Sequence, residues 1–321
     1  MVTIRGCVGV GLLVAACSSE GSAAPVEGET GSTAASDPGS AGDDSTMREE
    51  TTGADSSSEQ PGTETSGGAS FPGCGGMAAL EGVTTGTITV AGVPRSFVVS
   101  MPDGYDPDEP TALVFAFHGR GGTAELFRSY SGLEAAAGDA AVFVYPQGLP
   151  LASMGGQTGW ELTQSGYDVV FVTQLLDELT ANLCIDPARV YATGHSFGGY
   201  FSNTLGCALS DRLRAIGPVA SGGPFGGCPD PMAAIVIHGI DDLVVPTSAG
   251  EATRDHWRAN NGCGADAEPT DVDTCVAYQG CDAGYDVIWC LHEESPPGIG
   301  THTWPSFAAP AIWSFFVAHG A

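Results

Sequence analysis

The chain has 321 residues, of which 38 are acidic and only 10 basic, all of them arginine, so its formal net charge at pH 7 is −28. Such a surface repels phosphate backbones and anionic lipid headgroups, which argues against nucleic-acid binding and favours a neutral partner. Roughly 250 residues have a globular composition, enough for one α/β domain with a sizeable core.

The first 17 residues are typical of an export signal. Arg5 precedes an apolar stretch, residues 8–16, that is too short to span a bilayer. The stretch leads directly into Cys17, and this ending resembles a bacterial lipobox, in which Cys17 would carry the lipid. The alternative is an ordinary signal peptide with an incidental cysteine. We expect a secreted protein, lipid-anchored to the bacterial cell envelope or extracellular.

Residues 18–72 consist largely of Ser, Gly, Thr, Ala, Glu and Asp. Such a segment cannot bury enough apolar surface to offset its ordering entropy. We therefore predict a flexible, negatively charged tether with a random-coil span of about 40 Å. The folded domain is predicted to comprise residues 73–321.

Eight cysteines remain beyond the signal segment, and an even number in an exported chain predicts up to four disulfides. Roughly a hundred pairings are possible, so none is assigned. No spacing typical of a metal site is present, and we expect neither a metal nor a cofactor. The eight are Cys74, Cys184, Cys207, Cys228, Cys263, Cys275, Cys281 and Cys290.

From Cys74 onward, apolar runs alternate with helical segments, which predicts a mostly parallel sheet with helices on both faces. A leading hairpin is expected to form an antiparallel edge. Strands are predicted at 86–90, 95–100, 112–118, 140–145, 189–193, 215–220, 233–238 and 285–290, and helices at 122–137, 167–183, 198–210, 248–260 and 307–319.

A serine motif, Gly-x-Ser-x-Gly at 194–198, lies between a predicted strand and an apolar helix. The bare pattern is weak in a chain with 47 glycines. At a strand-to-helix turn, however, it lifts the serine hydroxyl above the sheet edge, and the helix N-terminus stabilises developing negative charge. Ser196 is therefore the predicted nucleophile, and an incidental turn serine is the alternative.

A serine nucleophile needs a histidine base, and the base needs an acid that orients it. When the serine lies at a strand-to-helix turn of such a sheet, the acid follows the serine along the chain and the histidine follows the acid. Asp242 is the predicted acid because it follows a strand, with its neighbour Asp241 as the alternative. His302 is the predicted base, since its glycine-rich loop would swing the imidazole over the sheet edge. His292 is its competitor.

The tetrahedral intermediate of acyl transfer needs two hydrogen-bond donors for its oxyanion. The first is expected to be the backbone amide of Phe197. The second is expected to be the amide of Arg120, in the glycine-rich loop that follows the strand at 112–118. A plain glycine turn is the alternative for that loop.

Six segments span nearly all of residues 75–320, namely 118–122, 145–148, 168–172, 184–196, 242–246 and 302–305. Together and in this order they resemble the polyhydroxybutyrate depolymerase/feruloyl esterase family. The resemblance implies an α/β-hydrolase fold and an extracellular esterase with a Ser196–Asp242–His302 triad and no metal. One departure is the interrupted glycine run before His302.

We therefore predict a serine esterase acting on a polymer-linked ester, most simply a feruloyl or related side chain of xylan. A polyester such as polyhydroxybutyrate is the second candidate substrate. Trp160 and Trp304 are candidates for the walls of an aromatic acyl pocket, with core packing as the alternative for each. The protein is expected to be a monomer. A non-catalytic binding module and a serine peptidase are the rival functions.

Overall fold

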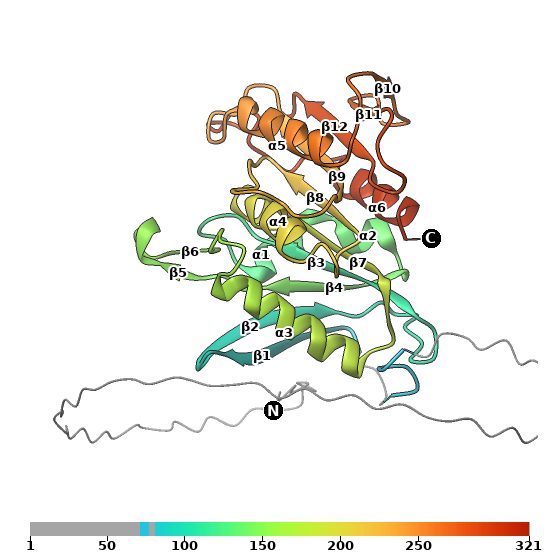
Figure 1. Ribbon diagram of the computed structural model, residues 1–321. Helices are drawn as coiled ribbons and strands as arrows, with labels where there is room; N and C mark the ends of the chain where they lie inside the picture. The colour runs from blue at the N-terminus through green and yellow to red at the C-terminus, as the bar shows by residue number, and fades with distance from the viewer. Residues whose placement is uncertain (1–70, 77–80, 321) are drawn as a thin grey trace, which may run out of the picture. The chain divides into compact units, whose positions relative to one another are not determined.

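The computed structural model describes residues 71–76 and 81–320 (Figure 1). Cys17, the signal segment and residues 18–70 of the predicted tether lie outside these ranges. Within them, no helix has the length and apolar character that a bilayer span requires.

Ten strands of the described residues form one sheet in the order β1-β2-β4-β3-β7-β8-β9-β12-β11-β10 (Figure 1). The six strands from β4 to β12 are parallel, and antiparallel strands flank them on both sides. The leading hairpin forms one edge, as predicted. The bounds are β1 Val83–Val90, β2 Val93–Ser100, β3 Thr111–Phe117, β4 Ala141–Pro146, β7 Ile185–His195, β8 Ala215–Val219, β9 Ala233–Gly239, β10 Ala267–Pro269, β11 Cys275–Tyr278 and β12 Val287–His292.

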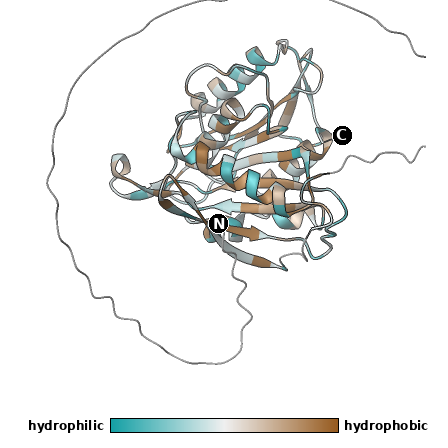
Figure 2. Cartoon of the chain, turned by 60° about the horizontal axis from the view of Figure 1, so that its bottom comes forward, coloured by the Kyte–Doolittle hydropathy of each residue, from teal (hydrophilic) through white to brown (hydrophobic). Residues whose placement is uncertain are grey.

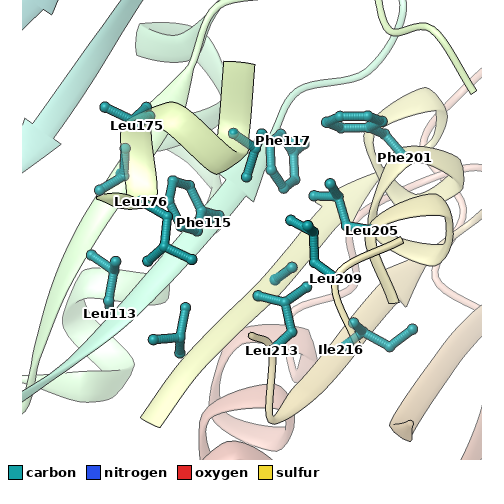
Figure 3. Close-up of a cluster of buried hydrophobic side chains, with 14 of the residues drawn as sticks. Leu113, Phe115, Phe117, Leu175, Leu176, Phe201, Leu205, Leu209, Leu213 and Ile216 are labelled. Atoms are coloured by element: carbon teal, nitrogen blue, oxygen red, sulfur yellow. The ribbon is translucent and has the colours of Figure 1, made fainter. Parts of the chain in front are cut away.

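Helices cover both faces of the sheet, because the central strands are apolar on both sides (Figure 2). In β3, Phe115 and Phe117 pack on the face covered by α3, α4 and α5 (Figure 3), whereas Val114 and Ala116 pack on the face covered by α1, α2 and α6. The helices are α1 Ala124–Ser131, α2 Leu133–Ala137, α3 Tyr167–Asn182, α4 Phe197–Ala208, α5 Thr247–Asn260 and α6 Ala308–Ala318.

The predicted single helix at 122–137 is wrong, because two helices meet at Gly132. This glycine adopts φ 68°, a left-handed conformation that ends α1. Sequence analysis also missed a second, two-stranded sheet, formed by β5 Leu149–Leu151 and β6 Gln157–Gly159 around a short 3₁₀ turn. It missed β10 and β11 as well, since these strands are only three and four residues long.

Four disulfides join the eight cysteines, which confirms the predicted number and supplies the pairing. One ties the residues before β1 to the start of β7, and two staple the β10–β12 edge. Bonds of this density are typical of proteins that fold in an oxidising, extracellular environment. The pairs are Cys74–Cys184, Cys207–Cys228, Cys263–Cys281 and Cys275–Cys290.

Candidate active site

Ser196 occupies the sharp turn between β7 and α4, with φ 54° and ψ −118°. A non-glycine residue in this region costs of order 1–3 kcal/mol, which the surrounding structure must supply. The turn places the serine at the carboxyl end of a central strand and at the N-terminus of α4. Its backbone therefore has the strained strand-to-helix geometry that exposes a nucleophilic hydroxyl.

The glycines on either side of Ser196 allow the backbone to pass this closely. A Cβ atom added to Gly198 would lie 2.0 Å from the carbonyl oxygen of Phe117, and one added to Gly194 would lie 2.4 Å from the carbonyl carbon of Gly198. Both contacts are with backbone atoms, which cannot move aside. The glycine spacing around the serine is thus a requirement of packing between β3, β7 and α4.

His302 lies between Ser196 and Asp242. Its Nε2 atom is 3.0 Å from the Ser196 Oγ, and its Nδ1 atom is 2.7 Å from the Asp242 Oδ2. The imidazole therefore bridges the hydroxyl and the carboxylate, with Nδ1–H donating to Asp242 when Nε2 accepts from Ser196. The structure thus brings together three predicted residues that are 60 and 106 positions apart in sequence.

Asp242 is held rigidly. Its side chain is buried, and its Oδ1 accepts hydrogen bonds of 2.8 Å from the amides of Val244 and Val245. The Nε2 of His238 lies 3.4 Å from its Oδ2 and 3.0 Å from the Val245 carbonyl oxygen. These donors stabilise the carboxylate in a water-poor site. Asp241 is exposed, and the His302 Nδ1 contacts Asp242, so the geometry favours Asp242 as the orienting acid.

The loop that carries His302 is attached to the loop that carries Asp242. The Thr301 Oγ1 accepts a 2.9 Å hydrogen bond from the Asp241 amide, and Asp242 forms an isolated β-bridge with Gly300. Gly300 has φ 60°, and an added Cβ would lie 2.1 Å from the Asp241 carbonyl oxygen. The glycine before the base is therefore required for this pairing.

The two expected oxyanion donors flank the serine. Among the described residues, the amides of Phe197 and Arg120 donate to no protein acceptor. Gly119 brings the Arg120 loop against the serine, since its added Cβ would lie 3.4 Å from the Ser196 Cβ. Free amides beside a nucleophile suit a developing oxyanion. The oxyanion role of both residues stays a prediction.

His118 fixes the conformation of the Arg120 loop. Its Nδ1–H donates to the Gly119 carbonyl oxygen at 2.8 Å, and its Nε2 accepts from the Gly148 amide at 3.0 Å. Burial lowers the pKa of His118 below its ordinary value, so the ring is neutral. His118, which directly follows β3, is thus a hydrogen-bonding residue at the end of a strand.

A cavity of about 320 Å³ opens over Ser196 and His302. Its walls come from the Arg120 loop, from Leu126 and Tyr130 of α1, and from Val244. His292, the alternative base, makes no contact with Ser196; it is buried and packs against Phe307. Burial lowers its pKa.

Neither predicted tryptophan lines this cavity. Trp160 is 1 % exposed, stacks on Phe201 and donates its indole N–H to the His118 carbonyl oxygen. It supports the Arg120 loop from the core side, so its placement in an acyl pocket is corrected to core packing. The half-buried Trp304 donates to the Ser131 carbonyl oxygen and packs edge-on against Phe127, behind the cavity wall.

Sequence reasoning missed the pair formed by Tyr130 and His195. The Tyr130 hydroxyl lies 2.9 Å from the His195 Nδ1, and the two side chains form one wall of the cavity. Burial, followed by the charge of His302, lowers the pKa of His195 to about 3, so the ring beside the base is neutral. The helical position of Tyr130 gave no signal of this contact.

One group of potential metal ligands is present among the described residues, namely Cys207, Cys228 and His256. Both sulfurs are joined in a disulfide, so they are not available as thiolate ligands.

A serine, histidine and aspartate in this arrangement, at the carboxyl edge of a mostly parallel sheet, are typical of α/β-hydrolases. Acetyl xylan esterase from Aspergillus awamori shares the fold, with a TM-score of 0.55 and 13% identity over 69% of this chain and 94% of that one. No family model matches the chain.

Two curated relatives are more similar in sequence. Feruloyl esterase C of Emericella nidulans is 36% identical over 271 residues, which cover 78% of this chain and 92% of the relative. Feruloyl esterase D of Neurospora crassa is 32% identical over 266 residues, which cover 76% of this chain and 89% of the relative. The chain belongs to the feruloyl esterase family and is a carboxylic ester hydrolase.

Proposed function

We propose that this enzyme removes feruloyl groups from plant polysaccharide by serine catalysis. The hydrogen-bonded chain Asp242–His302–Ser196 carries the proposal, because it supplies nucleophile, base and orienting acid in contact. The names of the relatives supply the acyl group, and the cavity beside the serine is lined partly by apolar and aromatic side chains.

The three residues of the triad and two backbone amides act together in the proposed reaction. His302 Nε2 accepts the proton of Ser196 as its Oγ attacks the ester carbonyl carbon. The amides of Phe197 and Arg120 bind the oxyanion. Asp242 stabilises the imidazolium, which gives the proton to the departing sugar oxygen as the ester bond breaks, so that the sugar leaves with a free hydroxyl. Water, deprotonated by His302, then attacks the acyl-enzyme and releases the acid and free Ser196.

The lipid predicted on Cys17 would anchor the protein to the bacterial cell envelope. The tether at 18–72 would connect this anchor to the catalytic domain, residues 73–321, and the protein would be a monomer. The sequence pattern supports this part of the proposal. Lipid labelling of the full chain tests it, and we expect Cys17→Ala to abolish incorporation of labelled fatty acid. Incorporation at the wild-type level would contradict the anchor.

A hydrolysis panel tests the substrate. The purified enzyme is given methyl ferulate, acetylated xylan and polyhydroxybutyrate film, with the Ser196→Ala variant as the background. We expect the highest rate on methyl ferulate. Release of hydroxybutyrate from the film without feruloyl hydrolysis would replace the proposal with a polyester depolymerase, and acetate release alone would replace it with an acetyl esterase.

A further inference from the structure

Arg120 differs from the other arginines of the described residues in having no partner. Within this part of the chain, six arginines contact a carboxylate, and Arg214 donates to the Gly284 carbonyl oxygen. The Arg120 guanidinium is exposed and forms neither an ion pair nor a hydrogen bond with the described residues. The six paired arginines are Arg95, Arg128, Arg189, Arg212, Arg254 and Arg258.

Arg120, whose side chain is exposed, is one of the residues that line the cavity over Ser196. His302 lines it as well, and no aspartate or glutamate of the described residues does. The absence is notable in a chain whose acidic residues outnumber its basic ones by 38 to 10. Within the described residues, the lining of this cavity therefore includes an arginine without a protein partner and no competing carboxylate.

We infer that the Arg120 side chain binds a carboxylate of the substrate beside the ester. The inference rests on the proposed function and narrows its substrate class to a largely neutral polysaccharide that bears an isolated uronate next to the feruloylated sugar. A guanidinium matches a carboxylate with two parallel hydrogen bonds. No bond is made or broken in this step, so Arg120 acts through its side chain as a specificity-determining residue.

The acidic surface as a whole is compatible with this assignment. At physiological ionic strength, charges more than about 8 Å apart are largely screened, whereas charges in contact are not. A densely charged polyanion would meet repulsion over the whole surface. An isolated carboxylate is attracted only by Arg120. The same charge distribution therefore also fixes the orientation of the polysaccharide across the cavity.

Two synthetic substrates test the inference. They are feruloyl oligosaccharides that are identical except that the sugar next to the esterified one is glucuronate in one and glucose in the other. We expect wild-type enzyme to prefer the glucuronate, as a ratio of kcat/KM, by about tenfold at low salt, the effect of one charge-assisted contact. Added salt should reduce the ratio. Arg120→Gln should abolish the preference, and Arg120→Lys should retain part of it.

The ratio of the two kcat/KM values distinguishes recognition by the Arg120 side chain from a disturbance of the oxyanion amide. If Arg120→Gln only disturbs the oxyanion amide, the rates on both substrates fall together and the ratio is unchanged, which would overturn the inference. A wild-type ratio of one would also overturn it. Arg128→Gln, on α1 but outside the cavity, is the matched control and should leave the ratio at its wild-type value. Failure of the proposed function is distinct, because the neutral substrate would then not be hydrolysed by wild-type enzyme.

Discussion

Two hollows among the described residues are lined by a serine and a histidine, yet only in the one over Ser196 does the histidine join the serine to an aspartate by hydrogen bonds. The cavity over Ser196 has about 320 Å³, and a larger one of about 480 Å³ lies between α6 and the β10–β12 edge. The larger hollow is lined by Ser314, His319 and Asp286. Residue types and volume alone therefore do not define a site.

The difference lies in how the histidine is used. Both ring nitrogens of His319 are already engaged, Nδ1 with the Phe315 carbonyl oxygen and Nε2 with Asp286. None is left to accept a serine proton. The Asp286 side chain is 59% exposed, whereas that of Asp242 is buried. A base needs one nitrogen oriented by a buried acid and the other directed at the nucleophile.

The largest expected effect separates the two serines. We predict that Ser196→Ala lowers kcat for methyl ferulate by at least about 10⁴-fold, because among the described residues the Ser196 hydroxyl is the one hydrogen-bonded to His302. Ser314→Ala, in the larger hollow, should leave kcat unchanged. Both variants should keep the wild-type melting temperature, measured by circular dichroism. Substantial activity in the first variant would remove Ser196 from the reaction.

Adjacent aspartates give the next contrast. Asp242→Asn should lower kcat about 10³–10⁴-fold, because an amide favours the wrong tautomer of His302. Asp241→Asn should stay close to wild type, since that side chain is exposed. Steady-state kinetics on methyl ferulate measure both. Equal losses in the two variants would show that the buried carboxylate is not the orienting group.

Removing a disulfide at the larger hollow should affect stability and not catalysis. Cys275 lines that hollow and pairs with Cys290, 15 residues along the chain. The double replacement by alanine should lower the free energy of unfolding by about 3 kcal/mol. Urea titration measures the loss, and kcat of the folded variant at 25 °C is the comparison. A large fall in kcat of the folded variant would link the two hollows.

Acidification should destabilise the protein through the catalytic edge, where burial lowers the pKa values of His118, His195, His238 and His292. These rings bind protons in the unfolded chain below about pH 6.5 but resist them in the folded one. Unfolding therefore takes up protons, and stability falls as the pH drops from about 6.5 to 5, by up to about 1.4 kcal/mol per pH unit for each ring.

Urea titrations at pH 7, 6 and 5 check this dependence. In the variant His292→Gln, the free energy of unfolding should change less per pH unit than in wild type, because one titrating ring has been removed. A free energy of unfolding that does not change over this interval would show that the four rings titrate alike in the folded and unfolded chains.

Much of the fold and of the candidate site was predictable. The central strands are apolar on both faces, and their residue pattern predicted a parallel sheet with helices on both sides. The serine turn needs glycines at fixed positions. Asp242 and His302 followed from chain order and family resemblance, and both now lie in hydrogen-bonded contact with the predicted partner.

The sequence by itself determined the central strands of the large sheet, where the serine turn lies, and that eight cysteines would pair, because these depend on local periodicity, backbone sterics and residue counts. Only the tertiary structure decided the disulfide pairing, the core position of Trp160, the contact between Tyr130 and His195, and the isolation of Arg120. Those features depend on which distant side chains meet, and that is fixed by packing across the sheet.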